Sequence, residues 1–147
     1  MKRLDRKSDC AINFSLQTFG DPWSLLIVRD IVFFGKKTYG EFLASDERIG
    51  TSVLANRLVT MEKEAILIKK LSKQDKRKEE YYLTAKGLDL IPILIDLTVW
   101  GAKYDAATGA SKKWLKAIKL DRDGIVKRTQ HIVKNGGFVK QDYDMIA

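Results

Sequence analysis

Residues 51–83 read TSVLANRLVTMEKEAILIKKLSKQDKRKEEYYL, and this stretch decides the fold. In its first half, apolar side chains recur at spacings of four, three and four residues, at Leu54, Leu58, Met61 and Ala65. This spacing is typical of an amphipathic helix with one buried face, so we predict a helix that begins at Thr51. On a helical wheel the solvent-facing side holds Ser52, Asn56, Val59, Thr60 and Lys63, with Val53, Ala55 and Arg57 at its flanks.

The second half of the stretch changes to an extended pattern. Residues 66–71 and 79–83 are rich in apolar and aromatic side chains, and the run 72–78 between them is polar, so we predict a β-hairpin. Six of the ten residues 69–78 are Lys or Arg, opposed there only by Asp75. The tip of this hairpin should therefore project positive charge.

A short helix is expected near the amino terminus, after a basic arm. Its apolar positions are Cys10, Ile12, Phe14, Leu16 and Phe19. Ser8 or Asp9 is predicted to cap its first turn, and Gly20 to end it.

Two further helices are expected before residue 51. Asp21 followed by Pro22 is the pattern of an N-cap and a first helical residue, so a second helix should run on through 23–34. Thr38 and Glu41 have the spacing of a capping box, which predicts the start of a short third helix.

After the hairpin, Thr84 is expected to cap a long helix that runs to about Tyr104. Apolar side chains surround its axis, at Leu88, Leu90, Ile91, Ile93, Leu94, Ile95, Leu97, Val99 and Trp100. A helix that is apolar on all sides is buried on all sides. One face should pack on the domain's own core and the other on a second copy, in a two-fold homodimer. Pro92 is expected to kink this helix slightly.

The 147 residues carry 27 Lys and Arg against 19 Asp and Glu, which gives a formal charge of +8, and 45% of them are hydrophobic. This composition predicts one globular domain and excludes a wholly disordered chain. We divide the chain into a basic arm at 1–7, a domain with its dimerisation helix at 8–104, and a helical extension of unknown role at 105–147. The extension should hold helices at 111–120 and 123–134. No apolar run approaches the ~20 residues of a membrane span, and no secretory segment follows the basic start, so a cytoplasmic location is expected.

The predicted order of elements is that of a winged helix-turn-helix, in a mainly α chain with one small β-hairpin. In this architecture the amphipathic helix enters the major groove of DNA and the basic hairpin contacts the flanking phosphates. Together with the charge of +8 and the predicted homodimer, the pattern indicates a transcription regulator whose partner is double-stranded DNA.

Several short segments form a recognisable set: Cys10, Gly20-Asp21-Pro22-Trp23-Ser24-Leu25-Leu26-Ile27-Val28-Arg29-Asp30, Tyr39-Gly40-Glu41-Phe42, Leu54-Ala55-Asn56-Arg57-Leu58, Leu83-Thr84-Ala85-Lys86-Gly87 and Trp100-Gly101. Over residues 10–104, this set resembles the HxlR family of winged-helix transcriptional regulators. The resemblance implies a dimeric repressor or activator that binds a palindromic operator. The chain departs from the family pattern in Ala11, where a proline is usual, in Ala65, where a glycine commonly ends the recognition helix, and in its longer segment past Asp105.

Nine side chains are candidates for DNA contacts. Asn56 suits base reading, because its amide can pair with adenine through two hydrogen bonds, and Arg57 can pair with guanine or hold a phosphate. Thr51 and Ser52 stand at the start of the helix, where hydroxyls and free backbone N–H groups suit phosphate. The remaining candidates are lysines and an arginine suited to phosphate: Lys63, Lys73, Lys76, Arg77 and Lys78. The alternatives are a plain N-cap for Thr51 and a surface ion pair for Arg57, with Glu62 or another neighbour.

Cys10 is a candidate sensor, because some members of the resembled family respond to oxidants or electrophiles through a cysteine at this position. The nearby cations Arg3, Arg6 and Lys7 and a helix start would favour its reactive thiolate form. The alternative is a buried, inert thiol, since cysteine is among the most buried residue types.

Two other function classes remain open. The aromatic residues could line a small-molecule pocket, although at helical spacing such residues more often form core: Trp23, Phe33, Phe34, Tyr39, Phe42 and Trp100. A winged helix can also serve as a protein-interaction module that does not bind DNA.

Enzyme activity is disfavoured. The chain contains no phosphate-binding glycine loop, no nucleophile-elbow motif and no pair of histidines, and His131 has no evident partner. With one cysteine and one histidine it offers neither an internal disulfide nor the usual ligands of a structural zinc site, so no metal or cofactor is expected.

Overall fold

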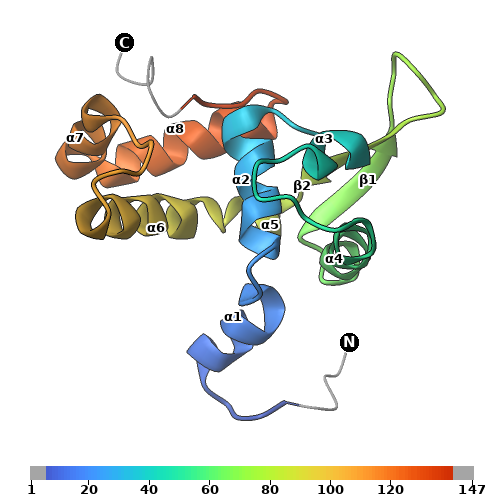
Figure 1. Cartoon of the computed structure of the whole chain (residues 1–147), viewed down its shortest axis with the longest axis horizontal. Helices are drawn as coiled ribbons and strands as arrows, with labels where there is room; N and C mark the ends of the chain where they lie inside the picture. The colour runs from blue at the N-terminus through green and yellow to red at the C-terminus, as the bar shows by residue number, and fades with distance from the viewer. Residues whose placement is uncertain (1–5, 141–147) are drawn as a thin grey trace.

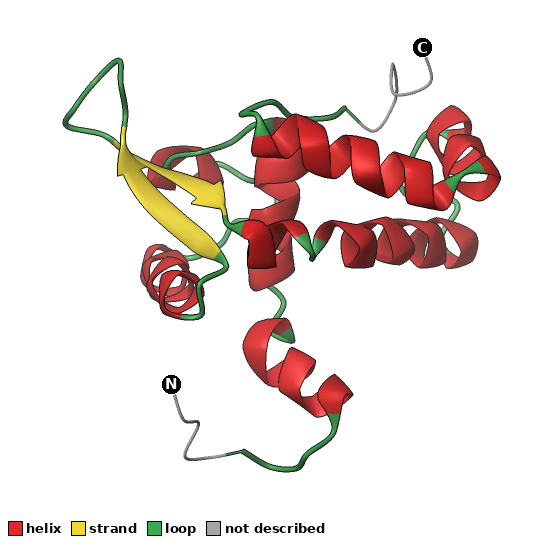
Figure 2. Cartoon of the chain, turned by 180° about the vertical axis from the view of Figure 1, so that it is seen from behind, coloured by secondary structure: helices red, strands yellow, loops and turns green. Residues whose placement is uncertain are grey.

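The computed structural model describes residues 6–140; residues 1–5 of the predicted basic arm, including Arg3, and residues 141–147 lie outside this range. The chain is mainly helical with one two-stranded antiparallel sheet, as Figures 1 and 2 show. Its elements are α1 (Ala11–Phe19), α2 (Ser24–Phe34), α3 (Tyr39–Leu43), α4 (Thr51–Lys63), β1 (Leu67–Leu71), β2 (Glu79–Leu83), α5 (Ala85–Leu88), α6 (Ile91–Tyr104), α7 (Lys112–Leu120) and α8 (Arg122–Lys134). This is the predicted winged helix-turn-helix.

Helix α4 begins and faces the core as its sequence period predicts. Leu54, Leu58 and Met61 are all buried, against a core that includes Val28 and Val32 of α2. Because these three positions lie along one side of a helix, their burial leaves the opposite side of α4 in solvent.

The predicted hairpin is confirmed, with Leu67 paired to Leu83 and Leu71 to Glu79. Side chains alternate across the sheet, so Leu67 is buried while the next residue, Ile68, is exposed. The backbone N–H of Tyr81 donates to the carbonyl oxygen of Lys37 at 2.7 Å, which ties the sheet to the segment before α3.

The end of α4 explains the departure noted at Ala65. Ala65 adopts a left-handed backbone with φ 58°. The N–H of Ile66 donates to the carbonyl oxygen of Met61, and the N–H of Ala65 donates to the carbonyl oxygen of Glu62. This is a Schellman motif, whose left-handed position favours glycine because a Cβ crowds the following carbonyl.

We therefore expect Ala65→Gly to raise the free energy of unfolding by about 1 kcal/mol, since relief of the left-handed penalty exceeds the added flexibility of the unfolded chain. Urea denaturation followed by circular dichroism measures the change. Ala55→Gly, in the exposed middle of the same helix, should instead lower stability by about 0.5 to 1 kcal/mol. If both substitutions lower stability equally, Ala65 is not strained.

The start of α1 differs from the prediction. The helix begins at Ala11, Cys10 is its N-cap, and no side chain accepts a capping hydrogen bond. Neither Ser8 nor Asp9 caps it, because the Ser8 hydroxyl oxygen accepts from the N–H of Cys10, a residue still outside the helix.

The start of α2 also differs, whereas that of α3 is confirmed. Asp21 accepts hydrogen bonds from the N–H groups of Trp23 and Ser24, at 3.0 and 2.9 Å, but the regular helix begins only at Ser24. Pro22 therefore lies before the helix and not at its first position. Thr38 and Glu41 form the predicted capping box at α3.

The predicted long helix after Thr84 is wrong: it is split between Leu88 and Ile91 into α5 and α6. Pro92 lacks the N–H that would bond to the carbonyl of Leu88, and its ring would clash with that carbonyl, so the helical hydrogen-bond pattern is interrupted here. The Leu88 oxygen accepts instead from the Gln130 side-chain amide of α8, at 3.1 Å. The break is thus larger than the predicted kink.

The segment after α6 forms the two predicted helices, α7 and α8, and packs against the rest of the domain (Figure 2). Trp114 of α7 is fully buried, with its ring edge-on to Phe33 of α2 at 5.6 Å between centroids. The N–H of Val139 donates to the carbonyl of Val32 at 2.8 Å. These residues belong to the same hydrophobic core as α2 and α6.

Candidate nucleic-acid interface

Helix α4 and the hairpin lie at the same end of the molecule, away from α7 (Figure 1). On α4 the side chains of Thr51, Ser52, Asn56 and Lys63 are exposed. Exposed valines accompany them at Val53 and Val59. Polar and short apolar side chains on one helix face are the types that contact base edges and the thymine methyl group in the major groove.

Thr51 is the first residue of α4 and not its cap. The N-cap is Gly50, and no side chain accepts a capping hydrogen bond there. The alternative of Thr51 as a plain N-cap is therefore wrong. The Thr51 carbonyl accepts from the Tyr39 hydroxyl at 3.1 Å, which links α3 to the start of α4.

Arg57 is oriented by two neighbours on the protein. Its Nη1 donates to Asp21 at 3.3 Å, and its Nη2 donates to the Asn56 side-chain oxygen at 2.8 Å. The ion-pair alternative thus holds in part, with Asp21 as partner in place of Glu62. Burial raises the pKa of Asp21, but hydrogen bonds from Ser24 and Trp23 and the charge of Arg57 outweigh this and lower it below its usual value.

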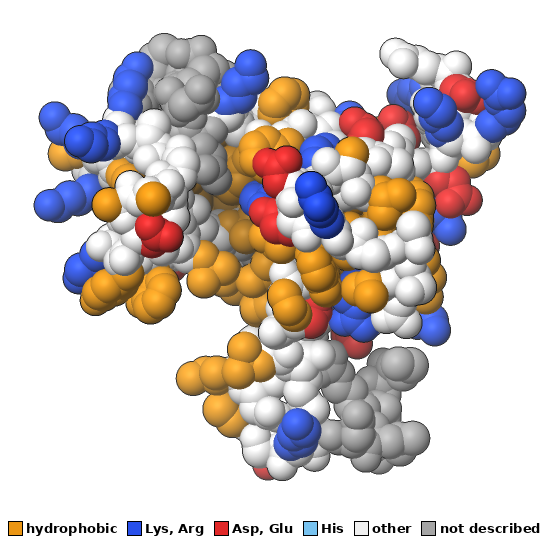
Figure 3. All heavy atoms as spheres, in the orientation of Figure 1, with side chains coloured by type: hydrophobic (Ala, Val, Ile, Leu, Met, Phe, Trp, Pro, Cys, Tyr) orange, Lys and Arg blue, Asp and Glu red, His pale blue; other side chains and the backbone are white. Residues whose placement is uncertain are grey.

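The hairpin tip carries the expected positive charge, and Figure 3 shows Lys and Arg side chains gathered there. Lys73, Lys76 and Lys78 are exposed and form no ion pair within residues 6–140. Arg77 donates to Asp75 at 3.1 Å, and this hydrogen bond, with one from the Arg77 backbone, lowers the pKa of Asp75. Three cations at the tip are therefore directly available to an anion.

Closer to the body of the domain, the basic residues of the hairpin have partners. Lys69 lies 3.9 Å from Glu62 and 3.5 Å from Glu79. Lys70 and Lys37 both stack on the ring of Tyr82, at 5.2 and 5.1 Å from its centroid. The sequence pattern does not reveal Lys37 as a basic neighbour of the hairpin, because it precedes α3 in the chain.

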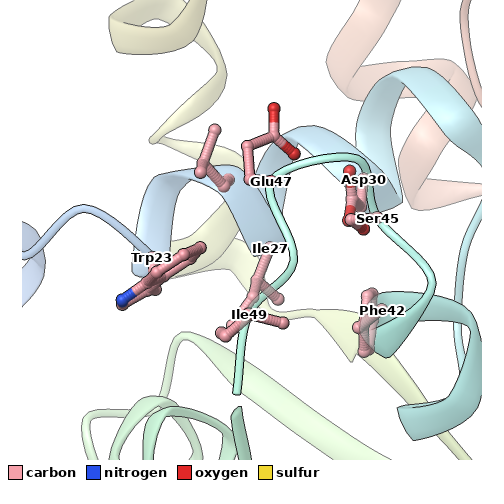
Figure 4. A pocket seen from close by; sticks show the side chains of 8 residues that line it. Trp23, Ile27, Asp30, Phe42, Ser45, Glu47 and Ile49 are labelled. Atoms are coloured by element: carbon pink, nitrogen blue, oxygen red, sulfur yellow. The ribbon is translucent and has the colours of Figure 1, made fainter. Parts of the chain in front are cut away.

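A buried polar cluster connects α2 to the turn that precedes α4. Asp30 is 2% exposed, and it accepts hydrogen bonds from the hydroxyl of Ser45 and from Arg29, whose Nε is 3.0 Å away. Figure 4 shows Asp30 on α2 facing Ser45 on this turn. Arg29 also binds Glu47 of the turn, with nitrogen to oxygen distances of 2.6 and 2.9 Å.

The electrostatics of this cluster follow from its contacts. Hydrogen bonds from Arg29 lower the pKa of Glu47 to about 2, and burial opposes this. Lys36 lies 3.8 Å from Asp30 and donates to the Ser45 hydroxyl at 2.9 Å. A charged residue pair inside the apolar run of α2 is the sequence signal for such a cluster, although its partners in the turn cannot be read from the pattern.

Cys10 is exposed, which contradicts the alternative of a buried thiol. The neighbouring Arg6 lies 3.4 Å from Asp9 and donates to the Ser8 carbonyl oxygen. The Arg6 guanidinium is therefore directed to the Asp9 carboxylate and the Ser8 carbonyl oxygen.

The aromatic residues considered for a pocket divide between core and surface. Phe33 and Phe42 are buried, whereas Phe34, Tyr39 and Trp100 are exposed. Within the described part of the chain, no group of three or more His, Cys, Asp and Glu side chains is placed to hold a metal ion. Nor does any helix in this part have the length and apolar character to cross a membrane.

Comparison with known proteins adds independent evidence. Residues 18–109 match the family model described as HxlR-like helix-turn-helix. The uncharacterized HTH-type transcriptional regulator YdeP of Bacillus subtilis (strain 168) is 29% identical over 105 residues, which are 69% of this chain and 81% of YdeP.

Two solved structures share the fold. The crystal structure of PA1607, a candidate transcription factor, has a TM-score of 0.63 and 33% identity over 72% of each chain. The redox regulator HypR in its oxidized form has a TM-score of 0.57 and 27% identity, over 64% of this chain and 96% of HypR. Since the family model covers more than half of the residues, the chain belongs to the HxlR-like helix-turn-helix family of DNA-binding transcription regulators.

Proposed function

We propose that the chain binds a palindromic operator as a homodimer, with α4 in the major groove and the hairpin tip on the flanking phosphates. One observation carries this proposal. The exposed face of α4 and the exposed lysines of the tip, which form no ion pair within residues 6–140, lie at the same end of the molecule (Figure 1). A helix and a cationic projection at one end of the molecule fit one groove and its adjoining backbone.

The homodimer is supported by apolar side chains that the single chain leaves in solvent. Trp100 and Tyr104 of α6 are 66% and 67% exposed, and Ile12 and Leu16 of α1 are 71% and 60% exposed. Figure 3 shows hydrophobic side chains along the flank of α1, which projects from the body of the domain. Apolar surface of this kind marks a protein interface, and a two-fold dimer covers it on both copies.

Selection of bound sequences from a random DNA pool tests the whole proposal. A two-fold dimer should enrich palindromes whose half-sites are about 10 bp apart or a multiple of this spacing. Enrichment of single half-sites would contradict the dimer. Absence of any enrichment, with retention of random duplex, would contradict sequence-specific binding.

Within this arrangement, Asn56 and Arg57 act as one base-reading unit. The Arg57 to Asn56 hydrogen bond holds the amide, and Asp21 holds Arg57. Thr51, Ser52 and Lys63 on the same helix are assigned to phosphates.

Asn56→Ala is expected to weaken binding to the selected operator by about 1 to 3 kcal/mol, because the substitution removes an amide that pairs with one base. Binding to random duplex should hardly change. Titrations of both DNAs followed by fluorescence anisotropy give the two affinities. Lys63→Gln is the matched comparison and should weaken both equally, whereas an equal loss for Asn56→Ala would contradict its reading role.

Cys10 is proposed as a thiol switch, on the basis of its exposure at the start of α1 and the likeness to a redox regulator. Because α1 belongs to the proposed dimer surface, oxidation or an intermolecular disulfide at Cys10 should alter the arrangement of the two copies.

Treatment with diamide is expected to change the operator affinity of the natural chain and not that of Cys10→Ser, since no other cysteine is present. Fluorescence anisotropy measures the operator affinity, and intact mass spectrometry measures the modification of Cys10. A natural chain whose mass changes while its affinity stays constant would exclude the switch.

A further inference from the structure

A wide cleft separates the helix-turn-helix from the α6–α7 end of the molecule. It measures about 970 Å³ and lies between α2, α6 and the segments on either side of α7 and α8. Leu26 and Phe34 of α2, Leu97 and Gly101 of α6, and Phe138 of the carboxyl-terminal segment line it. Figure 3 shows hydrophobic side chains in the recess beside α2. This size and lining are those of sites for small organic molecules.

Both charged side chains that line the cleft are basic, and one of them, Arg29, is paired with Asp30 and Glu47. Arg29 and Lys140 line the cleft, and no Asp or Glu is among its described lining residues. Lys140 forms no ion pair within residues 6–140. Four N–H groups of Arg29 donate hydrogen bonds to Asp30 or Glu47: the one on Nε, one on Nη1 and both on Nη2. A guanidinium has five N–H donors, so one on Nη1 remains for a ligand.

The aromatic lining indicates the rest of the ligand. Phe34 and Phe138 are 55% and 43% exposed, and the Arg29 guanidinium lies 5.2 Å from the centroid of the Phe34 ring. Gly101 and Gly109 leave open space, because a Cβ at either would meet no atom within 4 Å. Flat rings stack on flat rings, and small residues make room for them.

The cleft shares one residue with the cluster that fixes the turn before α4. Arg29 lines the cleft and also holds Glu47 at 2.6 Å. Glu47 is partly exposed, so a second anion on Arg29 would compete with it. Such competition would loosen the turn that places α4.

We propose that this cleft binds a small aromatic carboxylate, with its rings against Phe34 and Phe138 and its carboxylate between Lys140 and Arg29. The bound anion weakens the Arg29 to Glu47 pair and lowers operator affinity. The effect on operator affinity rests on the proposed DNA-binding function, whereas binding of the carboxylate in the cleft does not. Both are tested with the full chain.

Ligand binding is measured without DNA by titration calorimetry, with 2-naphthoate as the probe and 2-naphthamide as its uncharged match. The carboxylate should bind at least about tenfold more tightly than the amide, as expected for a charge-assisted hydrogen bond. Lys140→Gln should remove about the same factor. Gly101→Leu and Gly109→Leu, which narrow the cleft from two different elements, should weaken binding, while Ala106→Leu outside the lining should not.

Absence of binding at millimolar 2-naphthoate, equal affinity of the amide, or undiminished binding by both leucine variants would overturn the assignment of this site. Circular dichroism and sedimentation confirm that each variant keeps its fold and assembly. Operator affinity is then measured with and without saturating 2-naphthoate, and a decrease of at least several-fold is expected. Tight operator binding that the bound carboxylate leaves unchanged overturns the coupling alone. Failure of the ligand-free chain to bind DNA contradicts the proposed function and not the cleft.

Discussion

Raising the salt concentration from about 50 to about 200 mM is expected to lower operator affinity by about 10³ to 10⁵-fold, if a dimer neutralises roughly 6 to 10 phosphates. The reason is the release of counterions, whose entropy drives binding less as bulk salt increases. Fluorescence anisotropy over a series of salt concentrations gives the slope of log affinity against log salt. A nearly flat slope would contradict a phosphate-dominated interface.

The hairpin should account for part of this slope. The double variant Lys76→Gln, Lys78→Gln removes two cations that have no ion pair among the described residues, so the slope should flatten by about 0.9 for each phosphate that is no longer neutralised. The sequence preference should remain, because lysines on phosphates carry no base information. Lys113→Gln, Lys116→Gln on α7 is the matched control, with the same change of charge at the opposite end of the molecule (Figure 1). Equal flattening in both variants would show an effect of net charge alone.

Asp30→Ala is expected to lower the free energy of unfolding by about 3 to 5 kcal/mol, because it leaves charged and polar partners in a buried site without their acceptor. Asp30 is 2% exposed and contacts Arg29, Lys36 and Ser45. Urea denaturation followed by circular dichroism measures the decrease. Operator affinity of the folded fraction should fall as well, since the cluster fixes the turn before α4.

A second aspartate provides the control for this effect. Asp96 binds Arg122 through two hydrogen bonds of 2.7 and 2.8 Å, but its side chain is 60% exposed. Exposed pairs contribute little in water, so Asp96→Ala should cost less than about 1 kcal/mol and leave operator affinity unchanged. A comparable decrease for both substitutions would show that burial is not the cause.

Local patterns in the sequence predicted much of the DNA-binding unit. The period of Leu54, Leu58 and Met61 predicted which face of α4 is buried, and the capping box at Thr38 predicted the start of α3. These features depend on residues within about one helical turn or across a single hairpin, so short stretches suffice to indicate them.

Cap positions were less predictable. Asp21 accepts the hydrogen bonds of a cap. The pair Asp21-Pro22 nevertheless predicts a helix that begins at Pro22, whereas α2 begins two residues later, at Ser24. Helix ends depend on small differences between competing hydrogen bonds, which a residue pattern does not resolve.

By itself, the sequence determined the order of elements, the inward face of α4 and the basic hairpin, because periodicity and turn chemistry act between near neighbours in the chain. Only the tertiary structure decided that Arg57 pairs with Asp21, that Gln130 satisfies the carbonyl freed at Pro92, and that Asp30 and Arg29 hold the turn before α4. These interactions join residues distant in sequence, and each depends on how the helices pack. No local pattern encodes that packing.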